Sequence, residues 1–155
     1  MDYIVLKWLH ILSSTVLFGT GVGSAFYMLL TSLTRDVRAV AVLSHHVVLA
    51  DWLFTTPAVF IQPLTGYLLI RIAGFPMHAH WIMWSVALYA VAIACWLPVV
   101  VLQIRLRRIA AAAVATGAAE LPPEYWRNLR WWVALGILAF FAFVAIFFLM
   151  VAKQG

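Results

Sequence analysis

The chain alternates long apolar stretches with short polar connections. Four stretches, at about residues 8–31, 47–70, 81–103 and 131–152, contain only one formally charged residue, Asp51. As a helix, each stretch is long enough to cross the roughly 30 Å hydrocarbon layer of a bilayer. A helix also satisfies its own backbone hydrogen bonds in lipid. The pattern therefore predicts an all-α, polytopic transmembrane four-helix bundle that forms one domain over residues 1–155.

Polar residues recur along single faces of the first three spans. The second span carries them at spacings of three and four residues, which places them on one helical face: Asp51, Thr55, Ala58, Gln62 and Thr65. We expect this face to point into the bundle, because polar groups are costly against lipid. The first span has a similar stripe of His10, Ser14, Leu17, Gly21, Ser24 and Met28. The third span offers two stripes, either of which could face inward: Ser85, Tyr89, Trp96 and Gln103, or His80, Trp84 and Cys95.

Breaker residues indicate how the spans are connected. Residues 32–46 are expected to carry a short helix, and residues 71–80 a tight turn at Gly74 and Pro76. The third span should continue as a helix to about Thr116, break at Gly117 and the following prolines, and restart near residue 124. Within the first span, Gly19 and Gly23 form a GxxxG pair. This pair predicts close helix packing, with room for a flat prosthetic group as the alternative.

Composition and charge narrow the class of protein. A hydrophobic share of 66% and a mean hydropathy of +1.04 exclude a secreted disulfide scaffold, a disordered chain and a soluble enzyme. The net charge of +5 does not point to nucleic acid, because the bases flank the spans. Lys7, Arg71 and Lys153 fall on one side, and seven arginines fall on the other: Arg35, Arg38, Arg105, Arg107, Arg108, Arg127 and Arg130. The positive-inside rule then predicts that the side with seven arginines is cytoplasmic and that both termini lie on the other side of the membrane.

Asp51 is the only ionisable carboxyl group within the predicted spans. It is expected about one turn inside the cytoplasmic end, level with Arg105 at the end of the third span. The spacing predicts an ion pair between these two side chains that locks two helices together. A proton relay through Asp51 is the alternative.

Histidines suggest a cofactor. His10, His78 and His80 are all expected near the outer surface, where two imidazoles could ligate a b-type haem. We expect His10 and His80 as the favoured ligand pair. The remaining haem contacts are expected from Arg71 or Lys7 at the propionates, from Trp81 and Trp84 along the porphyrin, and from Tyr89 and Gln62 as deeper hydrogen-bonding groups. Copper is the alternative, because Met77 and Met83 add thioethers to His78 and His80.

Five motifs carry a resemblance that covers nearly the whole chain. They are residues 6–14 (LKWLHILSS), 17–26 (LFGTGVGSAF), 50–57 (ADWLFTTP), 62–66 (QPLTG) and 95–100 (CWLPVV). In these motifs the chain resembles a bacterial family of predicted integral membrane proteins of unknown function, which implies a bacterial inner-membrane protein with both termini in the periplasm. It is more distantly similar to haem-binding membrane protoporphyrinogen oxidases and to inner-membrane copper-resistance proteins. The first relation implies that His10 is a haem ligand, and the second that it handles copper.

These observations together predict a membrane protein that binds haem b and has an electron-transfer or redox role. Whether it is itself a membrane oxidoreductase is left open. The alternatives are a copper-binding or copper-transporting membrane protein and a non-catalytic structural subunit. The expected partners are the lipid bilayer and either a membrane redox protein or a second copy of the chain, with no nucleic acid.

Overall fold

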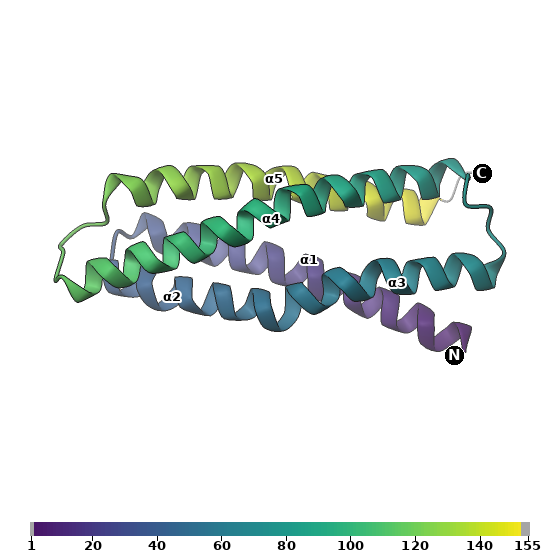
Figure 1. The fold of residues 1–155 in the computed structure, drawn as a ribbon, viewed down its shortest axis with the longest axis horizontal. Helices are drawn as coiled ribbons and strands as arrows, with labels where there is room; N and C mark the ends of the chain where they lie inside the picture. Colours follow the sequence, from purple (N-terminus) through teal and green to yellow (C-terminus); the bar gives the residue numbers. More distant parts are fainter. Residues whose placement is uncertain (1, 153–155) are drawn as a thin grey trace.

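The computed structural model describes residues 2–152, and every regular element in that range is helical. The elements are α1 (Tyr3–Leu33), α2 (Val37–Ala50), the π-helix η1 (Asp51–Thr55), α3 (Thr56–Ala73), α4 (His80–Ala115) and α5 (Pro123–Ala152). Since α2, η1 and α3 follow one another without a break, the chain forms four long rods (Figure 1). All four are long and apolar enough to cross a membrane, which confirms the predicted transmembrane four-helix bundle.

The second rod begins earlier than the sequence indicated, at Val37 rather than near residue 47. The carboxylate of Asp36 caps its start by accepting hydrogen bonds from the backbone N–H groups of Arg38 and Ala39 at 2.9 and 3.0 Å. Between this cap and Asp51 no proline or glycine interrupts the helix. The short helix expected in the first connection is therefore the first half of the second rod, and Asp51 lies near the middle of that rod.

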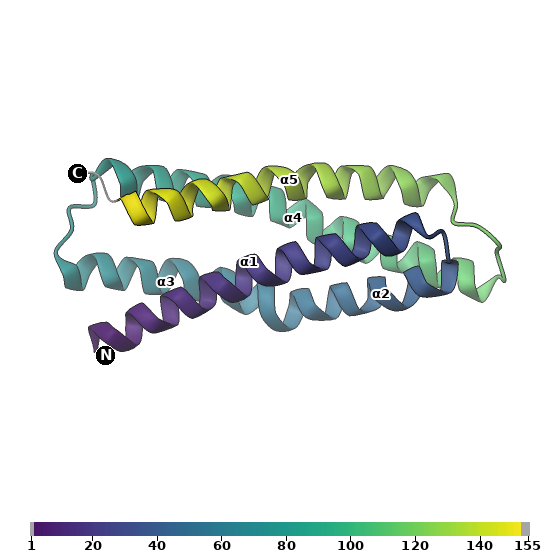
Figure 2. The ribbon, with the colours of Figure 1, turned by 180° about the vertical axis from the view of Figure 1, so that it is seen from behind.

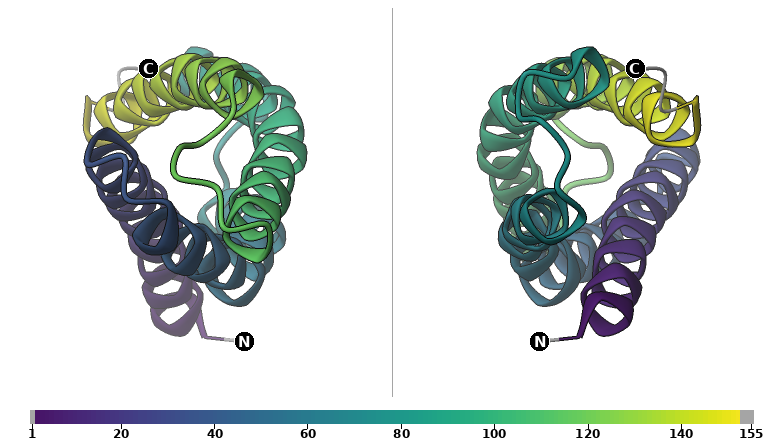
Figure 3. Two further views of the ribbon diagram at one scale, coloured as in Figure 1. Left: turned by 90° about the vertical axis from the view of Figure 1, so that its left-hand side faces the viewer. Right: turned by 90° about the vertical axis from the view of Figure 1, so that its right-hand side faces the viewer.

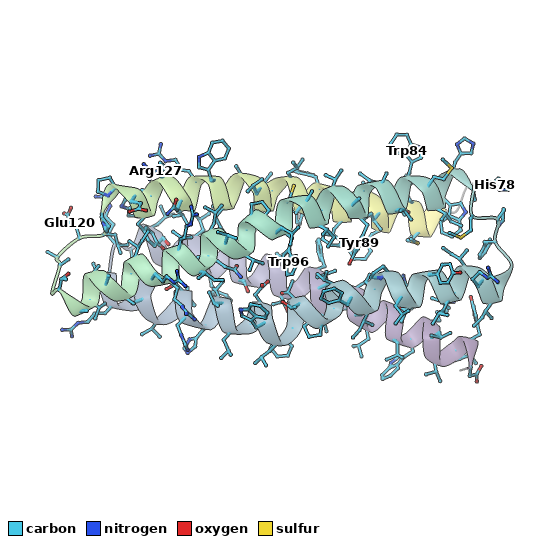
Figure 4. The ribbon with its side chains drawn as sticks, viewed as in Figure 1. His78, Trp84, Tyr89, Trp96, Glu120 and Arg127 are labelled. Carbon is cyan, nitrogen blue, oxygen red and sulfur yellow. The ribbon has the colours of Figure 1, made fainter. Side chains whose placement is uncertain are left out.

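The other two connections lie where the breakers predict them. Gly74 ends α3 in the left-handed conformation, with a φ of 72°, and α4 begins at His80. At the opposite end of the bundle α4 ends at Ala115, Gly117 has a φ of 68°, and α5 begins at Pro123. His78 and Glu120 mark these two turns in Figure 4.

The rods pack as neighbours around a central axis. Helix α5 lies along α4, and α1 lies against α2 and α3 (Figures 1 and 2). Viewed along the axis, the helices form a closed ring (Figure 3). Both ends of the described chain lie at the end of the bundle that carries the α3–α4 turn (Figure 1).

Two zones of the bundle interior are tightly packed. The larger zone lies near the α1–α2 and α4–α5 turns, and its buried members include Met28, Val40, Leu106 and Tyr125. There the hydroxyl groups of Ser32 and Tyr125 hydrogen-bond at 2.7 Å, and both side chains are fully buried. The smaller zone, halfway along the bundle, is built on Leu17, Ala58 and Val59. The polar residues around Asp51 lie between these two zones, and those around His10 lie beyond the smaller zone, toward the α3–α4 turn.

Candidate functional site

The polar face predicted for the second span points inward. Asp51, Thr55, Ala58 and Thr65 are all buried. Gln62 is half-buried and hydrogen-bonds to two residues of α1. This face therefore contributes to two clusters of polar side chains in the interior, one around His10 and one around Asp51.

His10 lies in a hydrogen-bond network between α1 and α3. Its Nδ1 is 2.9 Å from Thr65 Oγ1, and its Nε2 is 3.2 Å from Gln62 Nε2. Since Thr65 donates its own proton to the carbonyl of Ile61 at 2.8 Å, it accepts from Nδ1–H of the imidazole. Nε2 then accepts from the Gln62 amide, whose oxygen accepts from Ser13. The network assigns a neutral imidazole with both nitrogens engaged.

Gly66 allows this close approach of the two helices. A Cβ at position 66 would lie 3.1 Å from Cε1 of His10, closer than side chains normally pack. The imidazole therefore rests directly on the backbone of α3. Both ring nitrogens are engaged in hydrogen bonds between α1 and α3.

Apart from Gln62, the residues expected around the haem form no hydrogen bond to His10 within residues 2–152. Arg71, His78 and His80 are exposed, and Trp84 is 61% exposed and points away from the bundle (Figure 4). Tyr89 crosses from α4 to α3 and donates a hydrogen bond to the carbonyl of Val59 at 2.6 Å. Within residues 2–152, no group of three or more His, Cys, Asp or Glu side chains could hold a metal ion.

The second cluster of polar side chains surrounds Asp51 in the π-helix. Pro57 has no backbone N–H, so the carbonyl of Leu53 has no α-helical donor, and the backbone widens just before it. Thr56 N–H bonds instead to the carbonyl of Asp51. Trp96 of α4 donates its indole N–H to Asp51 Oδ1 at 3.2 Å. Figure 4 shows Trp96 on α4 above the second rod.

The expected ion pair between Asp51 and Arg105 is absent from the described residues, and that prediction is wrong. Asp51 is only 8% exposed, whereas Arg105 lies on the surface. The physical reason is helical rotation. Gln103 takes the inward position on α4, and Arg105, two residues further on, is turned by roughly 200°.

Two polar atoms at this site have no hydrogen-bond partner among the described residues. They are Asp51 Oδ2 and Gln103 Nε2, and both are buried. The side chains of Thr55 and Gln103 lie close enough to the carboxyl group to interact with it, but neither satisfies Oδ2. Because an unsatisfied buried polar group costs about 1–3 kcal/mol, these two atoms are the polar positions at which a bound group would gain most.

Asp51 and Gln103 line a cavity of about 550 Å³ inside the bundle. This volume lies within the range of small-molecule sites in proteins. The cavity lies between the two packed zones, since Leu17 and Val59 bound it on one side and Val47 and Trp132 on the other. Its lining is mostly aliphatic and aromatic, with seven polar side chains: Thr20, Ser24, Asp51, Thr55, Trp96, Gln103 and Trp132.

Two of the hydroxyl groups that line the cavity have no hydrogen-bond partner within the described residues. Ser14, Ser32 and Ser85, by contrast, each donate to a carbonyl of their own helix. Thr20 and Ser24 make no such bond within residues 2–152 and line the cavity instead. The indole N–H of Trp132 is likewise buried without a partner in that range. The cavity therefore offers hydrogen-bonding groups from α1, η1, α4 and α5.

The cavity reaches the outer surface of the bundle between α1 and α5. Its lining includes Phe26 of α1 and Ile137 and Phe141 of α5, which are 56%, 53% and 63% exposed. On one side of this opening, Phe18 stacks on Phe140 with ring centroids 5.5 Å apart. An opening between two membrane-spanning helices faces the lipid.

Small residues create this space. An added Cβ at Gly19, Gly21 or Gly23 would meet no heavy atom within 4 Å, so the close helix packing expected for the Gly19 and Gly23 pair is not formed. Gly21 lines the cavity, as does Gly136 of α5. Gly21 belongs to the inward stripe predicted for the first span, whereas no sequence pattern indicated that Gly136 would line a cavity.

Comparison with known proteins identifies the family but not a reaction. Residues 4–154 match the family described as predicted integral membrane protein (DUF2269), and the chain belongs to that family. No curated protein matches the chain. No solved structure matches it either. The resemblance to haem-binding oxidases and to copper-resistance proteins therefore stays a prediction.

Proposed function

We propose that this membrane protein binds a lipid-soluble molecule whose hydroxyl group reaches the Asp51 end of the bundle cavity. The observation that carries the proposal is the mostly apolar cavity of about 550 Å³, lined by a buried carboxyl group with an unpartnered oxygen. Its opening between α1 and α5 suggests entry from the bilayer. Ionisable residues within membrane spans commonly mark ligand or ion pathways.

The hydrogen-bonding inventory of the site favours a hydroxyl group. Asp51 Oδ2 is an acceptor, while Gln103 Nε2 and Trp132 Nε1 are donors, and all three lack partners among the described residues. A hydroxyl oxygen can donate once and accept twice. An ether or ketone could satisfy only the donors, and an ammonium group only the acceptor. A lipid-soluble alcohol or phenol therefore complements the site best.

This proposal accommodates the redox role expected from the sequence without a metal. A lipid-soluble quinol is a phenol, so the occupant itself could carry electrons to a separate membrane protein. Haem or copper bound at His10 is a further prediction, but the geometry does not favour it, because Thr65 and Gln62 engage both ring nitrogens. The cavity lining contains no His, Cys or Met side chain to ligate a metal.

A matched pair of probes tests the proposal. Binding of 4-dodecylphenol and of its methyl ether to the purified chain in lipid nanodiscs should be measured by equilibrium competition. The two probes differ only at the oxygen, which carries a hydrogen in the phenol and a methyl group in the ether. Only the phenol can therefore donate a hydrogen bond to Asp51. A hydrogen bond of about 1.4 kcal/mol changes affinity tenfold, so we expect the phenol to bind roughly ten times more tightly than the ether. Asp51→Leu should remove that preference.

Two glycine variants test the location of the site. Gly21→Leu places a side chain in the cavity, whereas Gly19→Leu makes the same change on α1 outside it, and neither added Cβ meets an atom within 4 Å. We expect Gly21→Leu to abolish saturable binding and Gly19→Leu to preserve it. Equal affinity for phenol and ether, or equal loss in both glycine variants, would contradict the proposal.

A further inference from the structure

A second surface of the molecule, distinct from the cavity, gathers two arginines and a tryptophan on one face of α5. A shallow groove there is lined by Pro123, Glu124, Arg127, Arg130, Trp131 and Ala134. Four of these residues, at positions 127, 130, 131 and 134, recur at spacings of three, one and three, which places them on the same helical face. The intervening residues Asn128, Leu129 and Trp132 are buried against the bundle, so the grooved face points outward.

The groove lies where α5 changes from polar to apolar. Residues 124–130 contain Glu124, Arg127 and Arg130, whereas residues 131–152 contain no charged residue. Trp131 stands at this boundary and is 63% exposed, as expected for an indole in the headgroup layer. Ala134 lies one turn further into the apolar segment. Its small side chain leaves a groove in which a hydrocarbon chain could lie along the helix.

The arginines of the groove have no acidic partner within residues 2–152. Arg127 and Arg130 are exposed, and Glu124 lines the same groove without forming an ion pair with either. Figure 4 shows the Arg127 side chain pointing away from the other helices. A third base lies nearby, since the Arg35 guanidinium is over the ring of Trp126 at 5.8 Å. The positive end of the α5 dipole adds to this charge.

We propose that this groove binds an anionic phospholipid, with its phosphate at Arg127 and Arg130 and its acyl chain past Trp131 along Ala134. Guanidinium groups bind phosphate oxygens through paired hydrogen bonds. The second half of the groove is apolar, so it can contact the acyl chain of a lipid, whereas a free phosphate ion would make no contact there. The inference does not depend on the occupant of the cavity, because the two sites share no lining residue.

Lipid retention tests the inference. The full chain should be placed in nanodiscs of phosphatidylcholine with one tenth phosphatidylglycerol. The lipids that stay bound when the protein is released from the nanodisc should then be identified by native mass spectrometry. Each arginine near an anionic headgroup contributes about 1 kcal/mol, so two arginines correspond to roughly a thirtyfold preference. We expect Arg127→Gln/Arg130→Gln to lose most of the phosphatidylglycerol enrichment. Arg127→Lys/Arg130→Lys, which keeps the charge, should retain part of it.

The matched control changes the same charge elsewhere at the same end of the bundle. Arg105 and Arg108 of α4 are exposed and do not line the groove, so Arg105→Gln/Arg108→Gln should keep the enrichment. An equal loss in this control would overturn the proposal, as would a wild-type protein that retains both lipids in their bulk ratio. Inorganic phosphate should neither stabilise the delipidated protein nor displace the lipid. Displacement by phosphate at equal concentration would also refute a lipid site.

Discussion

The network around His10 predicts that this residue couples α1 to α3. Replacing His10 with alanine removes both interhelical hydrogen bonds, to Gln62 and Thr65. Interhelical hydrogen bonds in membrane proteins average about 0.6 kcal/mol and reach about 1.7 kcal/mol. Two of them predict that His10→Ala lowers the free energy of unfolding by about 1–3 kcal/mol.

A double-mutant cycle isolates the part of this effect that belongs to the His10–Gln62 contact. Unfolding of the wild type, His10→Ala, Gln62→Ala and the double variant should be followed by circular dichroism as the fraction of sodium dodecyl sulfate in mixed micelles rises. We expect a coupling energy of about 0.6–1.7 kcal/mol. Ser14→Ala is the control, because the Ser14 hydroxyl bonds only to the carbonyl of Ile11 in its own helix. Its effect should stay within about 0.5 kcal/mol.

Two results would refute this reasoning. A coupling energy below about 0.3 kcal/mol would mean that the two side chains act independently. A haem absorption band that disappears in His10→Ala while the unfolding curve stays unchanged would make His10 a ligand rather than a packing residue. The second result would support the haem site predicted from the sequence.

Three further predictions follow from the packing and the charges. Gly66→Ala should lower the free energy of unfolding by about 1–3 kcal/mol in the same assay, because its Cβ would lie 3.1 Å from His10 Cε1. An unchanged midpoint of unfolding would contradict this contact. Arg105→Gln should change stability by less than about 0.5 kcal/mol, whereas Trp96→Phe, which removes the hydrogen bond to Asp51, should cost about 1 kcal/mol. The reverse order would favour an ion pair after all. Reporter fusions after Gly117 should be active in the cytoplasm and fusions after Gly155 in the periplasm, and the opposite pattern would overturn the predicted topology.

Much of the fold follows from the sequence because the bilayer leaves few alternatives. Apolar length predicts the four spans, and Gly74, Gly117 and Pro123 lie at the ends of the helices as expected. The spacing of polar residues also predicts the inward face of the second span. The start of that span was misplaced, because polarity in residues 37–46 indicated a connection although nothing there breaks a helix.

The candidate site was less predictable, since it depends on helix rotation and separation. A shift of two residues on α4 decides whether Gln103 or Arg105 faces Asp51. The spacing of small residues could not show whether Gly19 and Gly23 pack against another helix or leave space. The cavity depends on how α1 and α5 pack beside Gly21 and Gly136, and only the assembled bundle reveals that packing.

The most direct test of the account is to identify what the cavity holds in the cell. Wild type, Gly19→Leu, Gly21→Leu and Asp51→Asn should be purified from their native membranes, and their organic extracts compared by mass spectrometry. We expect one lipid-soluble compound with a hydroxyl group to be enriched in the wild type and Gly19→Leu, reduced in Asp51→Asn, and lost in Gly21→Leu. Four extracts with the same composition, from proteins that are equally folded, would contradict an intramembrane binding site.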